Sequence, residues 1–148
     1  MLATRLVRLI ESHSEELSRE LLRIFRTSSK CAGLMRVSDE ELQSRSQEIF
    51  TNLEDYLLEK SEVEFSRRYT ELGQRRHQQK VPFSDLVWAL QASKEHLHSF
   101  VQREGFADTV MELHAKLEML WRLDRFFDQA VYWASVGYEQ AEKNVIAA

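Results

Sequence analysis

The chain has 148 residues, of which 43% are hydrophobic and 30% are charged, a balance typical of one globular domain. Its formal net charge of −4 gives no general attraction to nucleic acid or to an anionic membrane surface. No apolar run approaches the roughly 20 residues of a membrane-spanning helix, and the single cysteine, Cys31, cannot form an internal disulfide. We therefore expect a cytoplasmic protein, a single domain over residues 1–148, that binds neither nucleic acid nor membranes.

Turn-forming residues are scarce, with one Pro and four Gly, so the sequence favours a few long helices over a sheet. Apolar residues at three- and four-residue steps predict a first helix over 2–25, followed by a polar loop at 26–33. A capping box begins at Ser38: its hydroxyl can accept a hydrogen bond from the amide of Glu41, and Glu41 can reach back to the amide of Ser38.

The capping box predicts a second helix up to about residue 59, and the apolar spacing predicts a third over 61–78. The sequence leaves open whether these are two helices or one bent helix. Pro82 suits the first turn of a fourth helix that runs to about residue 103, where Gly105 ends it. The last helix is predicted from about residue 107 towards the end of the chain. The fold class is thus all-α, a bundle of about five helices with a long C-terminal helix.

The predicted last helix is apolar on more than one side, which indicates that it is buried on more than one side. Either it is the central helix of the bundle, or it packs on its own core and on a partner subunit. We favour the second interpretation. It predicts a homodimer whose interface follows a seam with a period near 3.5 residues: Leu113, Leu117, Leu120, Asp124, Phe127 and Val131.

Two carboxylates, Asp124 and Asp128, lie one turn apart within this apolar helix. A buried carboxylate needs a partner, which Arg122 or Arg125 of a second copy could supply. Simple exposure to solvent is the equally weighted alternative.

The sequence offers no recognisable catalytic or metal site. Glu95 and His98 form one Glu-x-x-His pair, but a di-metal bundle needs a second pair and none is present. One cysteine cannot make a thiolate cluster, and Cys31 in its polar loop has no neighbouring histidine. We therefore expect no catalytic residues, no metal and no cofactor, and the protein is not expected to be an enzyme.

A haem-binding variant of a helical fold would need only one inward histidine on an apolar helix. His96 and His98 differ by two residues and point to nearly opposite sides of their helix, so at most one faces inward. The candidate residues facing a haem or a small apolar ligand are His96, His114, Trp121 and Phe127. A hydrogen-bonded or exposed histidine is the commoner case, so a ligand sensor is the alternative function.

The densest positive cluster comprises Arg67, Arg68, Arg75 and Arg76. It could bind a phosphate-bearing ligand or an acidic partner. Glu62, Glu64 and Glu71 stand at helical spacing from these arginines, which favours a solvated helix face with balanced charge.

The order of these motifs resembles the N-terminal domain of RsbR/RsbRD-type proteins, the co-antagonists of the switch kinase RsbT in bacterial stress signalling. The residues that carry the resemblance are Ile10-x-x-His13-x-x-x-Leu17, Ser38-x-x-Glu41-Leu42, Tyr69-x-x-Leu72-Gly73-x-x-Arg76, Val81-Pro82-Phe83-x-x-Leu86-Val87, Phe126-Phe127-Asp128 and Gly137-Tyr138. They span most of the chain and are mainly helix-packing residues.

The resemblance implies an all-helical, globin-like sensory or interaction domain that is dimeric, generally lacks haem and is usually joined to an output domain. It implies no catalytic residues. By analogy, His13 acts in helix packing or in a buried hydrogen bond, and the Tyr69–Arg76 segment acts as a hinge. His77–Lys80 stand where the family tends to have a Gly-containing turn, so this turn is expected to differ. The predicted function is a non-enzymatic bacterial signalling module with a protein partner.

Overall fold

The computed structural model describes residues 2–51, 53–57, 62–104 and 108–147, and these ranges contain helices and no strands. This confirms the all-α prediction. The elements are α1 (Leu2–Ser12), α2 (Ser14–Thr27), the 3-10 helix η1 (Ser29–Arg36), α3 (Asp39–Thr51), α4 (Leu53–Leu57), α5 (Glu62–Gln78), α6 (Phe83–Glu104) and α7 (Val110–Ala147).

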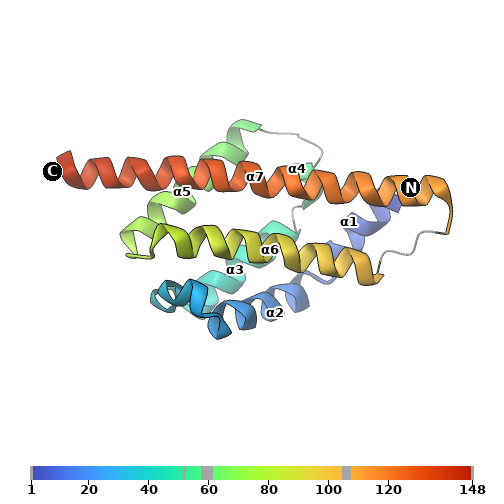
Figure 1. Cartoon of the computed structure of the whole chain (residues 1–148), viewed down its shortest axis with the longest axis horizontal. Helices are drawn as coiled ribbons and strands as arrows, with labels where there is room; N and C mark the ends of the chain where they lie inside the picture. The colour runs from blue at the N-terminus through green and yellow to red at the C-terminus, as the bar shows by residue number, and fades with distance from the viewer. Residues whose placement is uncertain (1, 52, 58–61, 105–107, 148) are drawn as a thin grey trace.

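The long helix α7 runs along the whole length of the molecule, and α5 and α6 pack against it (Figure 1). On the side of α6 away from α7 lies α2, which packs on α3 and on η1. The core between these helices is apolar and includes Ile10, Leu17, Leu21, Phe50, Leu53, Tyr69, Leu97, Met119, Leu123 and Phe127, each at most 2% exposed.

The predicted first helix is in fact two helices. His13 has φ −107° and ψ 16°, outside the helical range, and separates α1 from α2. Its Nδ1 donates a hydrogen bond of 2.9 Å to the carbonyl of Leu9, and its ring contacts that of Phe100 at 5.6 Å. The prediction of one continuous helix was therefore wrong, whereas the hydrogen-bonding and packing role inferred for His13 agrees with these contacts.

The predicted polar loop after residue 25 is also wrong, because η1 occupies most of it. Cys31 and Leu34 point into the core, and the Sγ of Cys31 lies 3.3 Å from the carbonyl oxygen of Phe25. Burial raises the pKa of the Cys31 thiol, so this group is a packed core residue. Arg26 holds the segment by donating hydrogen bonds of 2.6 Å to the carbonyls of Leu34 and Val37.

The contacts between α3 and α5 answer the question that the sequence left open. Glu41 near the start of α3 pairs with Arg75 near the end of α5, while Glu48 further along α3 pairs with Arg68 earlier in α5. The two helices therefore run in opposite directions and cannot be one bent helix. Residues 58–59, assigned to the end of the predicted second helix, lie outside the described residues.

Helix α5 approaches α7 so closely that backbone touches backbone. A Cβ atom on Gly73 would lie 2.0 Å from the carbonyl oxygen of Ala134, and one on Gly137 would lie 1.9 Å from that of Thr70. Only glycine fits at both positions. Just beyond this crossing, the Tyr138 hydroxyl donates a 2.8 Å hydrogen bond to the carbonyl of Val81, which ties the turn before α6 to α7.

The ends of α6 and α7 follow recognisable signals. Pro82 marks the start of α6 but stands one residue before it and not in its first turn, and its carbonyl accepts from the amides of Asp85 and Leu86. The predicted boundary residue Gly105 lies outside the described residues. Helix α7 begins where the Thr109 hydroxyl accepts a 3.1 Å hydrogen bond from the amide of Glu112, which satisfies one free donor of its first turn.

Candidate functional site

One side of α7 leaves large apolar side chains exposed. We define the α7 face as Val110, Leu113, Leu117, Trp121, Asp128 and Tyr132, which fall on one side of the helix because they follow one another at three-, four- and seven-residue steps. Leu113, Leu117 and Trp121 are 49%, 54% and 56% exposed, and the guanidinium of Arg125 lies 5.1 Å from the Trp121 ring centre. This face is the largest run of exposed apolar residues on any described helix.

The predicted dimer seam coincides with this face only in part. Leu113 and Leu117 are exposed, Leu120, Asp124 and Val131 are partly buried, and Phe127 is 2% exposed inside the core of its own chain. Phe127 therefore packs within the chain and presents no free surface. The physical reason is that a period of 3.5 residues drifts by about 20° per heptad around a helix of 3.6 residues per turn.

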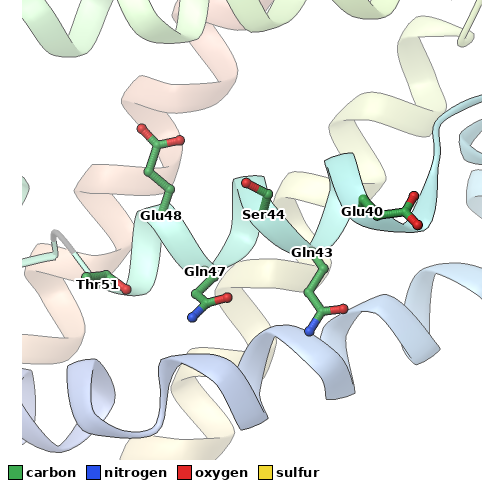
Figure 2. Close-up of a pocket in the computed structure, with 6 residues that line it drawn as sticks. All are labelled: Glu40, Gln43, Ser44, Gln47, Glu48 and Thr51. Carbon is green, nitrogen blue, oxygen red and sulfur yellow. The ribbon is translucent and has the colours of Figure 1, made fainter.

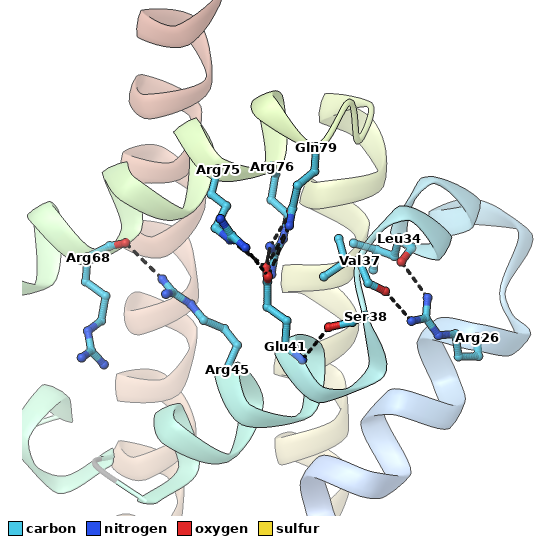
Figure 3. Close-up of polar contacts among 10 residues, drawn as sticks. All are labelled: Arg26, Leu34, Val37, Ser38, Glu41, Arg45, Arg68, Arg75, Arg76 and Gln79. Atoms are coloured by element: carbon cyan, nitrogen blue, oxygen red, sulfur yellow. Dashed lines mark hydrogen bonds and ion pairs between the residues drawn. The ribbon is translucent and has the colours of Figure 1, made fainter.

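A partly buried ion-pair network links α3 to α5 (Figure 3). The Ser38 hydroxyl accepts from the amide of Glu41 at 3.1 Å, which is the first half of the predicted capping box. The second half does not form, because the Glu41 carboxylate instead accepts hydrogen bonds from Arg75, Arg76 and Gln79 on or just after α5.

Burial and hydrogen bonding shift the pKa values of the two groups at the centre of this network, Arg76 and Glu41. Arg76 is 3% exposed, and burial lowers its pKa, an effect that the neighbouring Glu41 opposes. Hydrogen bonds from Arg75 first, and from Arg76 and Gln79, lower the pKa of Glu41 to about 2 although its own desolvation acts the other way. The pair is therefore charged throughout the physiological range.

The four arginines of the predicted anion-binding or partner-binding patch lie on α5 and pair with carboxylates of α3 and α5. Arg67 pairs with Glu71 at 3.0 Å on the exposed side of α5, whereas Arg68 pairs with Glu48 of α3. Arg75 and Arg76 share Glu41. Each of the four thus has a carboxylate partner in the chain, as the balanced-charge alternative expects, and the patch stays a prediction.

His96 and His98 point to opposite sides of α6, as their spacing predicts, and connect it to two different helices. His96 donates from Nε2 to the carbonyl of Leu17 at 3.1 Å and lies 3.3 Å from the Glu20 carboxylate, both on α2. Burial lowers the pKa of His96, and Glu20 partly counters this. The Nε2 of His98 lies 2.8 Å from Oδ1 of Asp124 on α7.

The four residues proposed to face a haem or small ligand do not meet. His96 faces α2, Phe127 is in the core, and His114 and Trp121 are exposed on α7. Among the described residues, no group of three or more His, Cys, Asp or Glu side chains could hold a metal ion. No described helix is long and apolar enough to cross a membrane.

A hollow of about 550 Å³, broadly open to solvent, lies on the outer side of α3 (Figure 2). All of its lining residues come from this one helix and all are polar: Glu40, Gln43, Ser44, Gln47, Glu48 and Thr51. Because one helix surface supplies the whole lining, the hollow gathers no convergent set of groups from different elements, and Glu48 is engaged by Arg68.

Sequence reasoning missed two of these relationships. The pairing of Glu41 with Arg76 joins residues 35 positions apart, and the contact of His98 with Asp124 joins α6 to α7. No local spacing signals either contact, although the sequence marks Glu41 as a capping residue and Asp124 as a carboxylate that needs a partner if buried.

Residues 3–148 match the family described as "RsbT co-antagonist protein rsbRD N-terminal domain". No curated protein and no solved structure matches the chain.

Proposed function

Since the chain belongs to the family of rsbRD N-terminal domains of RsbT co-antagonist proteins, we propose that it is a non-enzymatic signalling module that acts as a homodimer. Two copies associate through the α7 face, and the dimer acts on a protein partner in stress signalling. The family description names RsbT, so an RsbT-type switch kinase is the proposed partner. The observation that carries the dimer is the exposure of Leu113, Leu117 and Trp121 along one helix.

The length and composition of the α7 face support an interface. From Val110 to Tyr132 the face extends over about 33 Å at 1.5 Å per residue, long enough for a helix-to-helix contact. Large apolar side chains in a contiguous stripe with polar groups around them are a mark of protein–protein contact surfaces. Trp and Arg, present here as Trp121 and Arg125, are the residue types enriched among energetically dominant interface positions.

A second copy of the same chain is the occupant that the face fits. It carries both signs of charge, with Arg125 and Asp128 exposed on the same side of α7, so two copies can pair these groups reciprocally. A twofold axis brings identical patches together, and such symmetric dimers are the commonest protein oligomers. The sequence-based expectation that Arg125 of one copy meets an aspartate of the other therefore remains part of the proposal, with Asp128 as that aspartate.

The experiment is sedimentation velocity over a range of micromolar concentrations. The unmodified chain is expected to sediment as a dimer, and Leu117→Asp to sediment as a monomer because the interface would bury an unpaired charge. Val63→Asp is the matched control, since Val63 is also apolar and 80% exposed but lies on α5. A dimer that survives Leu117→Asp, or one that Val63→Asp also dissociates, contradicts the assignment of the interface.

The partner part of the proposal is tested separately. Calorimetric titration with a purified RsbT-type kinase is expected to show saturable binding, and the absence of binding to the dimer removes the kinase as partner. A globin-like arrangement with a bound haem or small ligand stays a prediction. Addition of haem followed by an absorbance spectrum tests it, since binding through a histidine would give a Soret band.

A further inference from the structure

The pair His98–Asp124 lies between α6 and α7 at the border of the α7 face. The Nε2 atom of His98 is 2.8 Å from Oδ1 of Asp124, and this buried nitrogen has no hydrogen bond among the described contacts. The contact is therefore mainly electrostatic, and its strength depends on whether the imidazole carries a charge. The two side chains are 27% and 46% exposed.

Asp124 would be covered by the same partner that covers the face. It follows Trp121 by three residues and Leu117 by seven, so the three residues lie on neighbouring parts of one side of α7. Removing the remaining solvent from a carboxylate is unfavourable unless a positive group neutralises it.

The other charged groups near Asp124 already have contacts. Arg122 donates to Glu118 and to the carbonyl of Leu57, and Arg125 lies over Trp121. Asp128, one turn further along α7, is another negative charge. Among the described ion pairs, His98 is the positive group recorded for Asp124.

The elements around α6 present other charges, but these face different residues. Glu20 of α2 faces His96, with Arg103 of α6 acting on the same ring, and Asp85 of α6 accepts from the amide of Gly33 in η1. From the junction of α1 and α2, the His13 ring contacts Phe100. From the end of α5, His77 meets the ring of Tyr138 on α7. Among the charged groups in the described contacts, Asp124 is thus the one that His98 faces.

We propose that dimerisation through the α7 face is linked to proton uptake at His98, so that acidification favours the dimer. This inference rests on the proposed homodimer. In the dimer a protonated His98 neutralises the covered Asp124, whereas a neutral ring leaves that carboxylate buried without compensation. The bound proton is therefore held more tightly in the dimer than in the monomer. By linkage, the dimer gains stability as the pH falls through the range in which imidazoles titrate.

The test is the dimer dissociation constant measured by sedimentation at about pH 6 and pH 8, within the range of histidine titration. The constant of the unmodified chain is expected to be several-fold lower at the acidic value, with a limit of about a hundredfold per pH unit because the symmetric dimer holds two copies of His98 and can bind two linked protons. Asp124→Asn is expected to dimerise equally at both values, because the charge that needs neutralising is gone. His98→Gln is expected to dimerise weakly and without pH dependence.

His77→Gln serves as the control, since it removes a histidine outside the face and is expected to keep the pH ratio. Circular dichroism at both pH values verifies that each variant is folded. A dimer whose constant does not change with pH, or a His98→Gln variant that keeps the full pH ratio, overturns the linkage and leaves the homodimer standing. A monomer at every concentration and pH overturns the homodimer as well.

Discussion

The carboxylate of Glu41 lies 2.5 Å from Nη1 of Arg76, a guanidinium whose side chain is 4% exposed. This contact joins the start of α3 to the end of α5 and places a charge among packed helices. A buried cation without its partner is strongly unfavourable, so the pair is required once the arginine is present.

Glu41→Ala is therefore expected to lower the free energy of unfolding by about 3–5 kcal/mol, because it leaves Arg76 buried and unpaired. Arg75→Ala, which removes the exposed member of the same network, is expected to cost much less than Glu41→Ala, because solvent screens the charge of an exposed guanidinium. Urea denaturation of the two variants measures this difference. Similar losses in both would show that burial of Arg76 does not determine the energy of the network.

The same pair makes the free energy of unfolding depend on pH in the acidic range. The pKa of Glu41 is about 2 in the folded chain and 4.5 in its ordinary state, so its stabilisation is complete above pH 4.5 and is lost as the pH falls towards 2. The stability of Glu41→Gln is expected not to show this loss as the pH falls from 4.5 towards 2.

His96 predicts a pH dependence nearer neutrality. Burial lowers its pKa below the ordinary 6.5, so as the pH falls through 6.5 the unfolded chain binds a proton more readily than the folded one. At protein concentrations low enough for the chain to be monomeric, stability is therefore expected to decrease from pH 7.5 to pH 5.5 in urea titrations, and His96→Gln is expected to reduce this slope. An unchanged slope in His96→Gln would contradict the account.

The crossing of α5 over α7 depends on two glycines. Gly73→Ala and Gly137→Ala would each place a Cβ within 2.0 Å of a carbonyl oxygen of the facing helix. The helices must separate to relieve this contact, so each variant is expected to lose about 1–3 kcal/mol of stability or more. Gln129→Ala, at an exposed position of α7, is the control and should change thermal stability little. A melting temperature unaffected by Gly73→Ala would show that the crossing can open freely.

The turn after α5 holds a residue in the left-handed backbone region. Lys80 has φ 61°, a conformation that disfavours residues with a Cβ and suits glycine, the residue expected in this turn from the family resemblance. Lys80→Gly is therefore expected to raise the free energy of unfolding by about 0.5–1 kcal/mol. Gln78→Gly, in the last turn of α5, should lower it by up to about 1 kcal/mol. Chemical denaturation measures both, and a loss of stability in Lys80→Gly would contradict strain at this position.

Much of the helical architecture is predictable from the sequence because local signals mark it. Pro82 and the Ser38 capping position set the starts of α6 and α3 to within a residue. The break at His13 leaves the apolar spacing on both sides intact, so periodicity alone cannot reveal it. The segment around Cys31 and Leu34 resembles a loop in composition, and the backbone of Cys31 is non-helical, with φ −131° and ψ 38°, so no regular helical spacing marks its two buried residues.

The candidate site is less predictable because it depends on distances between helices. The seam along α7 places Leu113 and Leu117 on the exposed side, but its drift around the helix carries Phe127 into the core. The partner of Asp124 is a histidine from α6, a contact set by how α6 packs on α7 and not by sequence spacing. The network around Glu41 likewise forms only when α3 and α5 meet.

In the proposed dimer one copy of the chain covers the α7 face of the other, and thiol labelling reports on this burial. Cys31 is 1% exposed, so a cysteine introduced at an exposed position becomes the reactive thiol. In Leu117→Cys the labelling rate is expected to fall as the protein concentration rises from low to high micromolar, because dimerisation buries the thiol. In Val63→Cys the rate is expected to stay constant. A labelling rate at position 117 that does not depend on concentration, while sedimentation detects only monomer, would contradict the claim.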